Sequence, residues 1–153
     1  MLPKFIDHHA APFPFLPEGI YDLTINDVSK CFAGNSHRAK LFYGFKIATE
    51  HLFQAGCSQV YLDGSFVTSK AFPGDFDALW DTSNVDVKKV HPAFIMVHLG
   101  TGLQKQMFGG YFFPAGATEG ISGKTFLDFF QTESFSGERK GIIRVKNYLS
   151  VIP

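Results

Sequence analysis

The sequence predicts an α+β or α/β-like domain in which a small mixed β-sheet is flanked by helices. The chain has 153 residues, a length that suits one domain with its own core, so we expect residues 1–153 to fold together. Its composition, 45% hydrophobic and 18% charged, is typical of a globular protein. Segments with a helical period alternate with short apolar runs bounded by turn residues, which indicates helices and strands in one chain.

Residues 1–20 are predicted to form an extended arm that lies across the domain surface. Proline, which does not fit inside a helix, recurs through this stretch at Pro3, Pro12, Pro14 and Pro17. The following segment, TINDVSKCFAG, places apolar residues at near-helical spacing behind a possible N-cap at Thr24. It predicts a short helix that stops at Gly34.

The most regular helical pattern lies in HRAKLFYGFKIATEHLFQAG. Its apolar residues follow a helical period, and Gly56 is a plausible C-cap. Arg38 opens this helix, where it would either form an ion pair with the N-terminal arm or face water.

Two strands are predicted next, with a short connection between them. SQVYLDGS is an apolar strand that ends at Gly64, FVTSKAF is a brief helix or turn, and DFDALWD is the second strand. This order implies a β-helix-β unit with a short crossover.

The C-terminal half is less regular. AFIMVHLGTGLQKQMFGG is ambiguous between strand and helix, because an unbroken apolar run has no period. YFFPA is a candidate short strand, and TFLDFFQTE fits either a helix or a strand. KGIIRVKNYLSVI alternates in places and is rich in β-branched residues, which predicts a closing strand.

Composition argues against several classes of protein. The formal net charge of zero gives no sign of a surface that binds DNA or another polyanion as a whole. Cys31 and Cys57 have no CxxC partner, so neither a disulfide framework nor a zinc site is expected, and reduced thiols fit the cytoplasm. No apolar stretch reaches signal-peptide length at the N-terminus or the roughly 20 residues that span a bilayer, so neither export nor a membrane partner is expected.

The first candidate for chemistry is the pair Asp75 and Asp77. Residues i and i+2 of a strand point to the same face, so both carboxylates would lie side by side. Two like charges at that distance favour a cation between them. Mg²⁺ prefers oxygen ligands and is usually held by one or two carboxylates and substrate phosphates.

The second candidate is Gly64-Ser65, at the end of the preceding strand. Gly64 lets the backbone pass close to a ligand, N–H groups at the start of a following helix would face a phosphate, and the Ser65 hydroxyl adds a donor. The alternative interpretation of both motifs is structural: a plain turn and a solvated strand end.

Together the two motifs resemble the signature of the polymerase-beta-like nucleotidyltransferases. In that superfamily a strand-ending Gly-Gly or Gly-Ser is followed, after a short spacer, by Asp, a hydrophobic residue and Asp or Glu. Here residues 66–74 are the spacer. LPEGIYDLTINDVSKCFAGNSHRAKLF, AGCSQVYLDGSFVTSKAFPGDFD and FLDFFQTESFSGERKGIIRV also look like successive blocks of an uncharacterised bacterial and phage family of small nucleotidyltransferase-like proteins.

The resemblance implies a nucleotidyltransferase fold and assigns roles residue by residue. Gly64 and Ser65 would hold the triphosphate of an NTP, and Asp75 and Asp77 would bind Mg²⁺ and act as the catalytic carboxylates. The residues that we consider as cations for the phosphates, with a solvated surface charge as the alternative, are Lys70, Arg139 and Lys140.

Active nucleotidyltransferases generally have a third carboxylate on a neighbouring strand. The candidate strand YFFPA has none, and Asp128 and Asp86 are considered as substitutes. The implied activity is transfer of a nucleoside monophosphate from an NTP to a protein or RNA acceptor. A cognate toxin or antitoxin is a candidate partner, because small stand-alone members often belong to toxin–antitoxin or phage-defence systems. The alternative is a catalytically silent, antitoxin-like binding module that acts through its aromatic surface.

Overall fold

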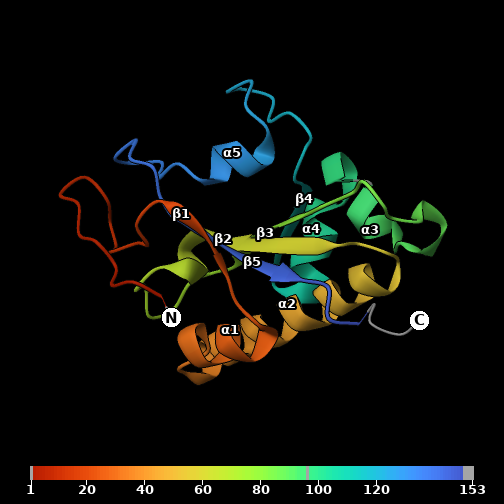
Figure 1. Ribbon diagram of the computed structural model, residues 1–153, viewed down its shortest axis with the longest axis horizontal. Helices are drawn as coiled ribbons and strands as arrows, with labels where there is room; N and C mark the ends of the chain where they lie inside the picture. The colour runs from red at the N-terminus through yellow and green to blue at the C-terminus, as the bar shows by residue number, and fades with distance from the viewer. Residues whose placement is uncertain (1, 96, 150–153) are drawn as a thin grey trace.

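Five strands form one mixed β-sheet with helices on both of its faces (Figure 1). The computed structural model describes residues 2–95 and 97–149. The elements in chain order, with η for a 3₁₀ helix, are β1 (Gly19–Asp22), α1 (Ile25–Phe32), α2 (Ser36–Gln54), β2 (Gln59–Asp63), η1 (Gly64–Val67), β3 (Phe76–Trp80), η2 (Val87–Lys89), α3 (Pro92–Ile95), α4 (Val97–Phe108), β4 (Gly110–Pro114), α5 (Phe126–Phe130) and β5 (Gly141–Lys146). The expected α+β class with a mixed sheet is confirmed.

The strand order in the sheet is β1-β5-β2-β3-β4. The outer pairs β1/β5 and β3/β4 are parallel, whereas β2 is antiparallel to both of its neighbours. The predicted closing strand is β5, which lies inside the sheet, and residues 150–153 of its segment lie outside the described residues. The edge strand β1, at the end of the predicted arm, was not anticipated.

The predicted crossover between β2 and β3 is wrong. These strands are antiparallel neighbours, with Asp63 directly opposite Asp77. A crossover is needed only between parallel strands. The connection from β2 to β3 starts with η1 and stays at one end of the sheet. The end of β2 and the start of β3 therefore meet at one edge, which places both candidate motifs together.

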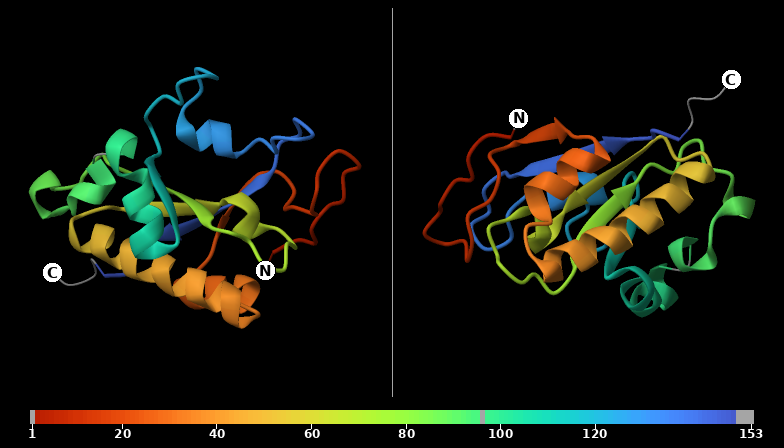
Figure 2. Two further views of the ribbon diagram at one scale, coloured as in Figure 1. Left: turned by 180° about the vertical axis from the view of Figure 1, so that it is seen from behind. Right: turned by 90° about the horizontal axis from the view of Figure 1, so that it is seen from below.

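The two faces of the sheet are covered differently (Figure 2). Helices α1, α2 and α4 pack on one face, where Phe45, Phe76 and Phe112 form ring contacts in the main core. On the other face, the segment between β4 and β5 packs over a smaller cluster that includes Ile142, with Phe126 against it. The segment between β4 and β5 also forms the roof of the candidate site.

Local sequence signals explain the helix boundaries. Thr24 caps α1, as the sequence predicted; it does so in a capping box with Asp27, and the Asn35 side chain caps α2. The ambiguous apolar segment forms α3 and α4, and TFLDFFQTE contains the short helix α5. In the described part of the chain, none of the helices combines the length and the apolar character that crossing a bilayer requires.

Arg38 neither pairs with the arm nor faces water, so both expectations for it are wrong. It is only 7% exposed, and its guanidinium donates hydrogen bonds of 2.6–3.1 Å to the carbonyl oxygens of residues 32, 66, 68 and 70. It therefore joins the start of α2 to the loop that follows the Gly-Ser turn.

Candidate functional site

The Gly64–Ser65 pair starts η1 directly after β2. Gly64 has a φ of +79°, in the left-handed region that favours glycine. A Cβ at this position would lie 2.6 Å from Oδ2 of Asp77, so the contact also excludes a larger residue. The turn and the Asp77 carboxylate are therefore direct neighbours, as the predicted site requires.

The two aspartates of the Asp-Phe-Asp motif have different surroundings. Asp77 lies within β3, whereas Asp75 precedes the strand and its Oδ2 is 3.4 Å from Nζ of Lys105. Burial, and then the charge of Asp75, raise the pKa of Asp77 to about 6. The prediction that both residues belong to the strand is wrong, but the charge of Asp75 does act on Asp77.

A third carboxylate, Asp63, faces Asp77 from the end of β2. Asp63 is 1% exposed, and its Oδ1 is 3.1 Å from Nζ of Lys140, which directly precedes β5. Its Oδ2 is buried and has no hydrogen-bond partner among the described residues. Burial raises the pKa of Asp63 to about 7 even though Lys140 lowers it, so the ion pair only partly offsets the cost of burial.

A cleft of about 360 Å³ opens at Asp77 and Lys140, whereas neither Asp63 nor Asp75 is among the described residues that line it. Its polar floor contains Gly64, Ser65, Thr68, Asp77 and Lys140. Three of the residues predicted from the Gly-Ser and Asp-Phe-Asp motifs therefore share one cavity with one of the three predicted cations.

Aromatic side chains from two distant segments wall the same cleft. Phe13 and Phe15 come from the N-terminal arm, and Phe129, Phe130 and Phe135 come from α5 and the loop after it. The predicted arm thus contributes to the site rather than only covering the surface. The cleft therefore has apolar, aromatic walls above its polar floor.

Glu133 is a further acidic residue of the cleft that the sequence did not indicate. Its carboxylate accepts hydrogen bonds from the backbone N–H groups of Phe135 (3.1 Å) and Ser136 (2.7 Å). These bonds fix the loop that forms the roof, so Glu133 has a structural role in shaping the cleft.

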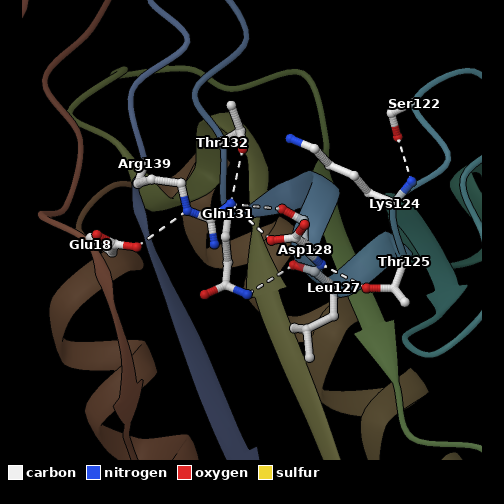
Figure 3. Close-up of polar contacts among 9 residues, drawn as sticks. All are labelled: Glu18, Ser122, Lys124, Thr125, Leu127, Asp128, Gln131, Thr132 and Arg139. Carbon is white, nitrogen blue, oxygen red and sulfur yellow. Dashed lines mark hydrogen bonds and ion pairs between the residues drawn. The ribbon is translucent and has the colours of Figure 1, made fainter.

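Two of the predicted cations do not line the cleft. The Lys70 ammonium lies over the ring of Phe13, 5.4 Å from its centroid. Arg139 pairs with Glu18 at 3.2 Å and with Asp128 at 2.9 Å (Figure 3). Arg139 therefore joins the N-terminal arm to α5 instead of reaching the Gly-Ser turn.

Neither substitute for the third carboxylate lies at the site. Asp128 is held by Arg139, and Asp86 caps η2 through the N–H of Lys88. On β4 the residue paired with Asp77 is Tyr111, in agreement with the absence of an acidic residue in YFFPA. Asp63 takes the facing position instead, and the signal for it was a carboxylate at the end of an otherwise apolar strand.

The charges of the site suit a divalent cation. Asp77 lies beside both Asp63 and Asp75, and among the described residues the ion-pair partners of these aspartates are Lys140 and Lys105. In the described residues, no cluster of three His, Cys, Asp or Glu side chains could hold a metal ion by itself. Mg²⁺ bound here would use Asp75 and Asp77 and complete its ligands with water and phosphate oxygens.

The stability of the protein is expected to fall as the pH rises from about 5 to about 8. Asp63 and Asp77 have pKa values raised from 3.8 to about 7 and about 6, so between these values the folded protein binds more protons than the unfolded chain. The free energy of unfolding should therefore decrease through this window by about 2–4 kcal/mol. Urea denaturation at both pH values measures the difference.

The matched variant for this pH dependence is Asp77→Asn, which removes one of the two carboxyl groups. It should reduce the difference between the two pH values, while His51, whose pKa is lowered by burial and by His91, acts in the opposite direction in both proteins. An unchanged difference in Asp77→Asn would show that the aspartates do not titrate in this window.

Comparison with known proteins identifies a family for this chain, but the description of that family names no activity. The model of one family, described as a family of unknown function (DUF6932), matches residues 9–146. No curated protein and no solved structure matches the chain.

Proposed function

Because the chain belongs to the DUF6932 family, whose function is unknown, we propose a function from its own site: Mg²⁺-dependent transfer of a nucleoside monophosphate from an NTP. The acceptor is a protein or an RNA. The proposal includes a polymerase-beta-like nucleotidyltransferase fold, which the motif resemblance supports.

One observation carries the proposal: the Gly64–Ser65 turn, Asp77 and Lys140 line the same cleft. The turn provides the Ser65 hydroxyl for a phosphate oxygen, and the Lys140 ammonium, which is paired with Asp63, provides a positive charge. The aromatic walls provide faces for a base, since stacking on a ring accepts any base.

The chemistry proposed is an in-line displacement at the α-phosphorus. A hydroxyl oxygen of the acceptor forms the new bond to phosphorus, the bond to the bridging oxygen breaks, and pyrophosphate leaves with that electron pair. The acceptor proton passes to a water molecule, because Asp77 would be a ligand of Mg²⁺ and a bound cation lowers the pKa of a carboxyl group. Mg²⁺ held by Asp75 and Asp77 would neutralise charge on the phosphates.

A second candidate is a catalytically silent module that binds a nucleotide or a partner protein without transfer, as an antitoxin would. Two observations favour it. Tyr111 stands on β4 where a third carboxylate would be expected, and the buried carboxylate Asp63 is already paired with Lys140. A toxin–antitoxin or phage-defence setting rests on the family resemblance alone.

Thermal unfolding with each NTP tests the binding step that the transferase requires. At a hundred times its dissociation constant, an NTP should add about 2.7 kcal/mol and raise Tm by roughly 5–10 °C, only when Mg²⁺ is present. Asp75→Asn/Asp77→Asn should abolish the rise. Asp7→Asn/Asp86→Asn removes two exposed carboxylates that do not line the cleft and should retain it.

The controls separate the possible results. No rise in the wild-type protein, or an equal rise in both double variants, would contradict the nucleotide site. A rise that depends on Mg²⁺, without transfer of label from an α-³²P-NTP to cellular RNA or protein, would favour the silent module.

A further inference from the structure

A second groove lies between α2 and α4, outside the cleft just described. Its volume is about 530 Å³. The two helices approach closely at its base, where Gly44 faces the backbone of Phe108. The groove is therefore a fixed feature of the packing between these helices.

The described lining of the groove contains two lysines, Lys40 and Lys105, and no Asp or Glu. Lys105 pairs with Asp75 beside the groove, so the local excess of positive charge comes from Lys40. This local excess of positive charge contrasts with the whole chain, which has 14 basic and 14 acidic residues. The groove therefore complements an anionic partner rather than a neutral peptide.

Exposed aromatic rings accompany these cations. Tyr43 lines the groove and is 64% exposed. Phe72 is 68% exposed and packs edge-on against His37, with ring centroids 5.9 Å apart. Rings beside lysines are the combination that binds single-stranded nucleic acid, because phosphates meet the charges and bases stack on the rings.

The groove also ends beside the candidate carboxylates. Gly74 and Lys105 belong to its lining, and Lys105 pairs with Asp75 at 3.4 Å. Helices α2 and α4 lie on the opposite face of the sheet from α5, which roofs the cleft (Figure 2). A donor in the cleft would thus meet Asp77, and an acceptor in the groove would lie beside Asp75, the partner of Lys105.

We propose that the α2–α4 groove binds single-stranded RNA, with phosphates on Lys40 and Lys105 and bases on Tyr43 and Phe72. Its role as the acceptor site rests on the proposed transferase function; the binding itself does not. An acidic peptide shares the charge but supplies no bases for the rings, so RNA is the partner that uses both features.

Fluorescence anisotropy with a labelled single-stranded RNA of about 12 nucleotides tests the groove, without NTP or Mg²⁺. Lys40→Gln/Tyr43→Ala should weaken binding at least tenfold and flatten the dependence of log K on log salt by about 0.7. The control Lys30→Gln/Ile121→Ala removes one exposed lysine on α1 and one exposed apolar side chain in the loop before α5, and should bind as wild type does. All four substitutions are at surface positions, and circular dichroism checks the fold.

Three results would overturn the inference: no binding by the wild-type protein, equal loss in the groove and control variants, or competition by an oligoglutamate peptide as effective as by unlabelled RNA. A different result would contradict the transferase proposal alone. If RNA binds in the groove but no NTP raises Tm, the RNA site is retained and the transfer reaction is rejected.

Discussion

Replacing Arg38 by methionine is expected to lower the free energy of unfolding by about 3–5 kcal/mol. The guanidinium makes five hydrogen bonds to four backbone carbonyls, and burial lowers its pKa. No carboxylate of the described residues is within ion-pair distance of Arg38, so these carbonyls, together with the Phe66 ring 5.1 Å from the guanidinium carbon, compensate the buried charge. Methionine fills much of the volume but leaves the carbonyls without donors, and chemical denaturation measures the cost.

The matched control is Arg139→Met. Arg139 is 37% exposed at its side chain and forms ion pairs with Glu18 and Asp128, which water can replace. Its loss should cost about 1 kcal/mol or less. Equal losses in the two variants would show that the carbonyl cluster around Arg38 contributes little.

Arg38 also bears on the candidate site. Its hydrogen bonds to the carbonyls of Phe66, Thr68 and Lys70 hold the loop that continues from the Gly-Ser turn. Any NTP-induced rise in Tm should therefore be smaller in Arg38→Met, even at a temperature where the variant is folded. Hydrogen exchange should show faster exchange in residues 64–70 than in α2.

The second large effect is expected for Gly44→Ala, which should destabilise the protein by about 2 kcal/mol or more. A Cβ at this position would lie 1.8 Å from the carbonyl oxygen of Phe108 and 2.7 Å from its carbonyl carbon. Both are backbone atoms, so no side-chain rotation relieves the clash and α2 must move away from α4. The same movement should weaken RNA binding in the groove between these helices.

Gly102→Ala provides a control with the opposite sign. Gly102 also lies inside a helix, α4, but a Cβ there would have no atom within 4 Å. Alanine should therefore stabilise the protein by about 0.5–1 kcal/mol through helix propensity alone. If Gly44→Ala were equally stabilising, the close approach of α2 and α4 would be contradicted.

Much of the local structure followed from the sequence. The helical period of α2, the cap at Thr24 and the strand that ends at Gly64 were predicted because each depends on neighbours a few residues apart. The Gly-Ser and Asp-Phe-Asp motifs were also visible. A continuous apolar run has no period, so α3 and α4 could not be told from a strand.

The composition of the site was only partly visible, since it depends on contacts between distant segments. Lys140 was one of three cations considered, and the sequence offered no means of preferring it over Lys70 or Arg139. The aromatic walls come from residues more than a hundred positions apart, Phe13 and Phe129 among them. Their meeting depends on the path of the arm over the sheet.

The sequence by itself determined the two motifs and the elements that carry them, because turns, caps and periodicity are set by local geometry. Only the tertiary structure decided that β2 and β3 are antiparallel, that Asp63 faces Asp77, and that Lys140 pairs with Asp63. The physical reason is that strand pairing and burial depend on contacts between residues far apart in the sequence. A solvated aspartate at a strand end would keep its ordinary pKa. Asp63 is instead 1% exposed and lies beside Asp77, and its pKa rises to about 7.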